Sequence, residues 1–240
     1  MKSLAASIIK RAVEKDQKEQ YTMALVLYEN GLQVLLESMK ELQDPVEKKH
    51  FHTRAKEYMD RAERIKALIE EGKKSGKYRE NMKIEAGSVG HGYDSVFGRF
   101  LSDTVTQIRI EEPYIRTFHQ CQNLLRFCEL AVQKCQSLSK ISLTTTSDPH
   151  DKSGQVSRLE ELKTNLAKHL VTLEIQFSDT LHDRQVILSN GWIIKIGRGL
   201  DYFRPPESKF ALGYFDLELR PCLETIVDIF HKSQIQENIK

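Results

Sequence analysis

The 240-residue sequence has no long apolar run. Its apolar stretches fall well short of the ~20 consecutive residues that a membrane-spanning helix needs. Near the N-terminus, Lys10 and Arg11 interrupt the segment in which a secretory signal would place its apolar core. We therefore expect a cytoplasmic protein whose contact with any membrane is peripheral.

An excess of charge of one sign is also lacking. Lys and Arg number 36 and Asp and Glu number 34, so the formal net charge is only +2. Proteins that bind DNA or RNA through their overall charge are usually strongly basic. The sequence therefore argues against nucleic-acid binding of this kind, although a local basic patch keeps it as an alternative. That alternative predicts a steep dependence of binding on salt, without any need for lipid.

Cysteine is sparse, with four residues and no Cys-x-x-Cys pair. No histidine stands at zinc-ligand spacing from them, so we expect neither a metal site nor a cofactor. Cys121, Cys128 and Cys135 recur every seven residues, which places them along one stripe of a helix. We expect these thiols to be small buried side chains that stay reduced.

The first 75 residues predict three amphipathic helices. The first runs from about Ser3 to Asp16, and the second, from Tyr21, repeats apolar residues in steps of three and four. The segment Gln43-Asp44-Pro45 ends the second helix and begins the third, which continues to about Gly72. Short connections between amphipathic helices favour an antiparallel bundle, predicted here for residues 1–75.

Residues 76–89 are polar and rich in glycine and are predicted as a linker, although Tyr78–Ile84 also suits an extension of the third helix. Residues 90–240 then alternate strand and helix patterns, which predicts a mixed sheet covered by helices. Ser189-Asn190-Gly191 is a hairpin signal because Asn and Gly both tolerate positive φ. Strands are predicted at 104–110, 140–144, 171–177, 186–188 and 192–196, and helices at 117–134, 156–169 and 223–232.

The third helix carries a candidate binding surface. On a helical wheel, Met59 lies about 80° from the centre of the buried face, and Asp60 lies on the far side. A soft apolar side chain beside a carboxylate suits a groove that receives an amphipathic helix. A methionine at the edge of the core beside a solvated carboxylate explains the same spacing without a partner. The spacing alone leaves both interpretations open.

Three segments resemble the MIT (microtubule-interacting and trafficking) domain: Arg11–Asp16, Ala24–Tyr28 and Tyr58–Ile65. The resemblance implies a three-helix bundle that binds the C-terminal helices of ESCRT-III subunits. It also implies that the groove between the second and third helices accepts leucines while Asp60 accepts an arginine. The residues that it places against the partner helix are Leu27, Leu32, Met59, Asp60, Ala62 and Glu63.

A different chemistry is suggested by His182-Asp183-Arg184. A histidine nucleophile with a cation two residues later suits attack on a phosphodiester. The segment resembles the phospholipase D superfamily, whose signature is His-x-Lys-x4-Asp, but Arg184 replaces the lysine, Ser189 replaces the aspartate, and the motif occurs once. Because losing the acid removes a group that positions the histidine, we expect no catalysis. The alternative is an active phosphodiesterase or nuclease that uses His182 in a dimeric site.

Basic and aromatic residues alternate in the last third of the chain, where Trp192, Tyr202, Phe203 and Phe210 interrupt the cations. Cations bind phosphate and aromatic rings reach the membrane interface, so this composition suits anionic headgroups. A solvated strand rim with core aromatics is the plain alternative. The predicted membrane or phosphate contacts are His182, Arg184, Lys195, Arg198, Arg204, Lys209 and Arg220.

The fold class expected from these observations is a three-helix antiparallel bundle followed by a phospholipase D-like α/β domain. The resemblance implies a non-catalytic adaptor with three kinds of partner: ESCRT-III tails, acidic phosphoinositide membranes, and a second copy of itself, bound through the C-terminal domain. It further implies a role in cytokinetic abscission, with the protein at the midbody and peripheral on late endosomal membranes.

Overall fold

The computed structural model describes residues 2–40 and 42–232, and it divides the chain into two compact units, Met1–Glu80 and Asn81–Lys240. The last eight residues of the predicted domain 90–240 lie outside the described residues. Within the described ranges, no helix is both long and apolar enough to cross a membrane.

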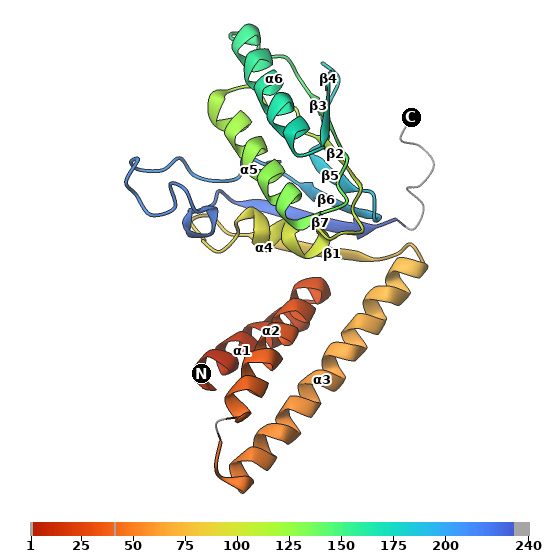
Figure 1. Cartoon of the computed structure of the whole chain (residues 1–240), viewed down its shortest axis with the longest axis vertical. Helices are drawn as coiled ribbons and strands as arrows, with labels where there is room; N and C mark the ends of the chain where they lie inside the picture. The colour runs from red at the N-terminus through yellow and green to blue at the C-terminus, as the bar shows by residue number, and fades with distance from the viewer. Residues whose placement is uncertain (1, 41, 233–240) are drawn as a thin grey trace. The chain divides into compact units, whose positions relative to one another are not determined.

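The first unit contains the three predicted helices. They are α1 (Lys2–Gln17), α2 (Tyr21–Lys40) and α3 (Pro45–Lys74) (Figure 1). Asp44 caps α3, because its carboxylate accepts a hydrogen bond of 2.9 Å from the amide of Val46, and Pro45 suits the first turn. The predicted helical class of this unit is confirmed.

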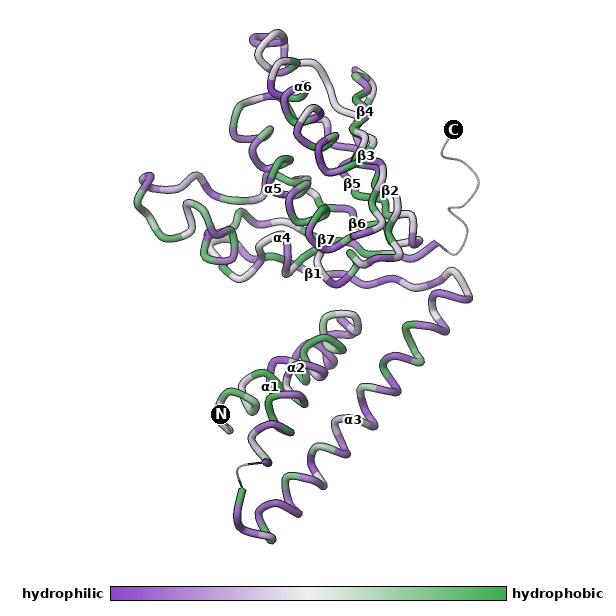
Figure 2. The backbone as a smooth tube through the Cα atoms, in the orientation of Figure 1, coloured by the Kyte–Doolittle hydropathy of each residue, from purple (hydrophilic) through white to green (hydrophobic). Residues whose placement is uncertain are grey.

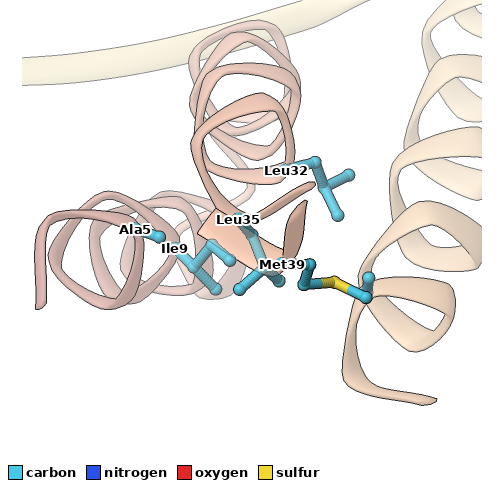
Figure 3. Packing of buried hydrophobic residues seen from close by; sticks show 6 residues of the cluster. Ala5, Ile9, Leu32, Leu35 and Met39 are labelled. Carbon is cyan, nitrogen blue, oxygen red and sulfur yellow. The ribbon is translucent and has the colours of Figure 1, made fainter. Parts of the chain in front are cut away.

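Apolar side chains from all three helices form its core. Ala5 and Ile9 of α1 pack with Leu32, Leu35 and Met39 of α2 (Figure 3), and Ala55 of α3 joins them. The backbones of α1 and α2 approach closely at Gly31, where an added Cβ would lie 2.7 Å from Cγ1 of Ile9. Only glycine fits there, and its lack of a side chain lets the two helices pack closely at this position.

An ion pair also joins the helices. Arg61 of α3 donates from Nη2 and Nε to Asp16 of α1 at 2.6 and 2.8 Å, and the hydroxyl of Tyr28 of α2 donates to the same carboxylate at 3.2 Å. The guanidinium of Arg61 holds the pKa of Asp16 below its usual range. One carboxylate therefore links all three helices.

The second unit is built on a seven-stranded mixed sheet with the order β1-β7-β6-β5-β2-β3-β4. β2, β3 and β4 run parallel, β5 pairs antiparallel with β2 and β6, and β6 pairs antiparallel with β7. The strands are β1 (Arg79–Ile84), β2 (Gln107–Glu111), β3 (Lys140–Thr145), β4 (Thr172–Phe177), β5 (Gln185–Leu188), β6 (Trp192–Ile196) and β7 (Thr225–His231).

Helices α5 (Phe118–Lys134) and α6 (Lys152–Lys168) lie side by side on one face of this sheet (Figure 1). The shorter helical segments are α4 (Tyr93–Phe97), η1 (Gly98–Phe100) and η2 (Leu217–Leu219). Cys121, Cys128 and Cys135 are buried free thiols, as expected, and Cys222 is a fourth. Burial raises the pKa of Cys128 to about 12, so this thiol stays protonated and unreactive.

Several local predictions for this unit are confirmed, and two are wrong. The hairpin forms as expected, with Gly191 at φ +98° between the antiparallel strands β5 and β6. Residues 79–84, within the segment predicted as a linker, form strand β1 rather than an extension of α3. The predicted helix at 223–232 is strand β7, because Val227 and Ile229 face the core while Ile226 faces solvent, a period of two.

Replacing Asp16 with alanine tests the three-helix link. We expect the free energy of unfolding to fall by about 1–3 kcal/mol, since two charge-assisted hydrogen bonds and the partner of Tyr28 are lost. Because the folded pKa is lowered, the carboxylate stabilises the fold above its ordinary pKa of 3.8, and this contribution is lost as the pH falls through the lowered value.

Chemical denaturation of both proteins at pH 7 and at about pH 2 measures this, and the difference between them is expected to shrink in acid. Glu14→Ala removes an exposed carboxylate from the same helix and serves as the control. Equal losses for the two variants would contradict the link.

Candidate functional site

The predicted partner-helix residues divide into buried and exposed groups. Leu27 and Leu32 of α2 and Ala62 of α3 are buried in the bundle. Met59, by contrast, is 49 % exposed, and Asp60 and Glu63 are exposed beside it on α3. The half exposure of Met59 agrees with the shoulder position that the helical wheel gives it. A soft apolar side chain with two exposed carboxylates close by on the same helix is therefore open to a partner, while the other three residues lie inside the bundle.

The structure also places the residues of the phospholipase D-like motif. His182 is exposed on the segment that leads into β5. Arg184 donates from its guanidinium to the carbonyl of Gly197 and lies over the ring of Tyr114, 4.7 Å from its centroid. Arg116 lies over the same ring at 5.1 Å. The guanidinium of Arg184, the cation of the motif, is thus held by contacts within the chain.

Ser189, at the aspartate position of the motif, has a structural task. Its Oγ accepts hydrogen bonds from the amides of Thr106 and Gln107 at 2.9 and 3.2 Å, immediately before and at the start of β2. This hydroxyl therefore anchors β2, an interior strand of the sheet.

A histidine–carboxylate pair that sequence reasoning missed lies at the N-terminus of α5. Nε2 of His119 is 3.2 Å from Asp201, and the same carboxylate accepts hydrogen bonds from the side-chain amides of Gln120 and Asn123. Nearby Glu112 is buried, which raises its pKa, and it accepts hydrogen bonds from the amides of Tyr114 and Leu200. These contacts join α5 to the segment after β6, a pairing of distant segments that no local motif signals.

The predicted cations are not equivalent in the structure. Lys195 lies 3.5 Å from Asp183, and Arg198 donates to the carbonyl of Glu224 at 3.0 Å while remaining exposed. Arg204 and Lys209 are also exposed. Arg198, Arg204 and Lys209 thus present charge to solvent along the segment between β6 and β7.

Arg220 differs from these three because only 7 % of it is exposed. Its guanidinium donates to the carbonyl oxygens of Gly213 and Tyr214, and burial lowers its pKa. Its hydrogen-bonding groups are used inside the chain, so we leave it out of any surface that contacts phosphate.

Sequence reasoning also did not predict that apolar side chains cluster on the surface of the segment held by Arg220. Phe210, Leu212 and Phe215 are almost fully exposed on a loop between β6 and β7 that extends from the body of its unit (Figure 1). Figure 2 shows hydrophobic stretches along this loop. The signal in the sequence is the apolar composition of Lys209–Phe215, which follows Pro205-Pro206. Composition alone does not tell whether these side chains point inward or outward.

Comparison with known families agrees with this architecture. Residues 3–67 match the family described as the MIT (microtubule interacting and transport) domain. Residues 90–231 match the family described as a phospholipase D-like domain at the C-terminus of MIT. The chain is 45 % identical over 234 residues to MIT domain-containing protein 1 of Mus musculus, an alignment that covers 97 % of this chain and 94 % of the mouse protein.

The role of Arg220 as a structural anchor is testable. We expect Arg220→Ala to loosen residues 213–214 and their neighbours, because two carbonyl oxygens lose their buried donor. Hydrogen exchange in this loop is then faster by at least about tenfold, while exchange in the first unit is unchanged. Arg204→Ala, which removes an exposed guanidinium from the same segment, is the control. Unaltered exchange in Arg220→Ala would refute the role.

Proposed function

The chain belongs to the family in which a phospholipase D-like domain follows an MIT domain, and on that basis we propose that it is a non-catalytic adaptor between ESCRT-III and acidic membranes. Its bundle receives the C-terminal helix of an ESCRT-III subunit. Its second unit, as a homodimer, holds a membrane that contains phosphoinositide. The setting is late membrane scission, at the midbody during cytokinetic abscission and on late endosomal membranes.

The observation that carries this proposal is the exposed position of Met59 on α3, next to the exposed carboxylates Asp60 and Glu63. MIT domains in general bind ESCRT-III tails. A flexible thioether accommodates leucine side chains of different shape, and a carboxylate beside it pairs with an arginine of the partner. Such a contact is small, so we expect a dissociation constant in the micromolar range, about −8 kcal/mol.

The membrane half of the proposal rests on exposed cations. Arg198, Arg204 and Lys209 stay in solvent on one segment of the second unit. Each basic residue near an anionic bilayer contributes about 1 kcal/mol, so three of them give a weak attraction. A homodimer raises the avidity for a membrane and for a filament that presents many tails, without any new kind of contact.

The state of the motif residues supports an adaptor without phosphodiesterase activity. Arg184 is bound to Gly197 and stacked on Tyr114, and Ser189 is bound to backbone amides. Among the contacts of the described residues, none joins His182 to a carboxylate that would orient its ring. A histidine without a positioned acid partner is a poor nucleophile for phosphodiester cleavage.

Substituting Met59 tests the helix receptor. We expect Met59→Asp in the full chain to weaken binding of a synthetic ESCRT-III tail peptide by at least about tenfold, because a charge would replace the apolar contact. Isothermal titration calorimetry measures the affinity, and thermal unfolding checks the fold.

Leu68→Asp is the matched control for this test. Leu68 is 43 % exposed on the same helix, and it lies nine residues from Met59, which is roughly the opposite face. We expect this variant to bind the peptide as the wild type does. Equal weakening by both variants, or by neither, would refute the predicted groove.

Charge reversal tests the membrane half. We expect Arg198→Glu/Lys209→Glu to reduce co-sedimentation of the full chain with phosphoinositide-containing vesicles by at least about tenfold at low salt. Lys152→Glu/Lys168→Glu, on the exposed surface of α6, changes the net charge equally and is expected to bind normally. Wild-type protein that fails to sediment with any acidic vesicle would refute membrane binding.

A further inference from the structure

The loop between β6 and β7 leaves its largest apolar side chains in water. Phe210 is fully exposed, Leu212 is 87 % exposed and Phe215 is 81 % exposed. All three lie within six residues of sequence, next to the exposed cation Lys209. Single exposed apolar residues are ordinary, but a cluster of this kind on one loop is typical of a binding surface.

The loop is held in this shape by its own contacts. The amides of Ala211 and Tyr214 donate to the carbonyls of Ser208 and Ala211 at 3.2 and 3.1 Å, which forms consecutive turns. Arg220 binds the carbonyls of Gly213 and Tyr214 from the core side.

Gly213 adds a steric constraint to these contacts. Its φ is +83°, and an added Cβ there would lie 2.8 Å from the backbone of Leu219. The outward position of the apolar side chains is therefore a consequence of a constrained backbone, in which positive φ and close packing both require glycine.

A lipid surface is the occupant that fits best. A stable protein–protein contact buries about 800 Å² on each partner, whereas two phenylalanines supply roughly 300–500 Å² and the leucine adds a smaller area, which leaves the cluster short of that size. A bilayer needs no complementary shape and accepts aromatic and aliphatic side chains at the boundary between headgroups and acyl chains. Arg204 and Lys209 on this segment are exposed cations that anionic headgroups attract, and they stand among the exposed carboxylates Glu207 and Asp216.

We propose that Phe210, Leu212 and Phe215 insert into the interface of an acidic membrane. This inference rests on the proposed membrane binding and adds the part of the surface that penetrates. The cations bring the domain to the bilayer, and the loop then buries apolar area that the chain otherwise leaves in water. Insertion of this kind resists salt, because burial of apolar surface is not screened, whereas purely electrostatic attachment is lost at high salt.

The test uses the full chain and a triple variant, Phe210→Ser/Leu212→Ser/Phe215→Ser. Vesicles of phosphatidylcholine and phosphatidylserine, with and without phosphoinositide, are titrated at about 0.1 M and about 0.5 M salt. We expect the variant to bind at least about tenfold more weakly at the lower salt and not at all at the higher. Leu170→Ser is the matched control, since Leu170 is also 87 % exposed but lies in the turn before β4.

A second readout follows the loop directly. Trp192 is the one tryptophan and is buried, so Phe210→Trp adds a reporter at the tip. We expect lipids brominated in the acyl chain to quench the added fluorescence, with little effect on Trp192 in the wild type. This measurement does not depend on whether serine substitutions change the fold.

The outcomes separate the two proposals. If the wild type binds vesicles and the triple variant binds equally well without quenching at position 210, the insertion is refuted and membrane binding stands. If the triple variant becomes monomeric by light scattering but keeps its affinity for vesicles, the loop is a dimer contact and the insertion is refuted. A wild type that binds no vesicle refutes both.

Discussion

Arg220 binds the carbonyl oxygens of Gly213 and Tyr214 because burial leaves its guanidinium no water to bind. Hydrogen bonds within the chain also hold polar groups that are less buried than Arg220. They join Asp16 to Arg61, Arg184 to Gly197, and Ser189 to the amides at the start of β2. The side chains that stay exposed to solvent form the surface on which the proposed function depends.

Two residues of the hydrolase-like motif make contacts of this kind. Serine at the aspartate position anchors β2, and arginine at the lysine position stacks on Tyr114. Both residues are thus held by contacts within the second unit. The second unit has a sheet with both parallel and antiparallel pairs, and its exposed cations are the residues that we propose contact a membrane.

The two proposed binding surfaces of the adaptor have the same kind of composition. In each, an apolar side chain is exposed beside charges: Met59 beside Asp60 in the bundle, and Phe210 beside Lys209 in the loop. The signs of the charges differ, which matches a basic partner helix in one case and an anionic bilayer in the other. Because we expect each proposed contact to be weak, strong attachment would require both to be occupied together.

The sequence by itself was sufficient for the three helices, the strand-helix alternation and the Asn-Gly hairpin, because these depend on local periodicity and turn chemistry. It misled at 223–232, since Ile226, Val227 and Ile229 suit a helix as well as a strand until pairing with β6 decides between them. The sequence also placed Met59 at the edge of the buried face of its helix. Only the tertiary structure decided which cations are exposed, that Arg220 is buried, and that Phe210, Leu212 and Phe215 point outward, because burial depends on contacts between segments distant in the chain.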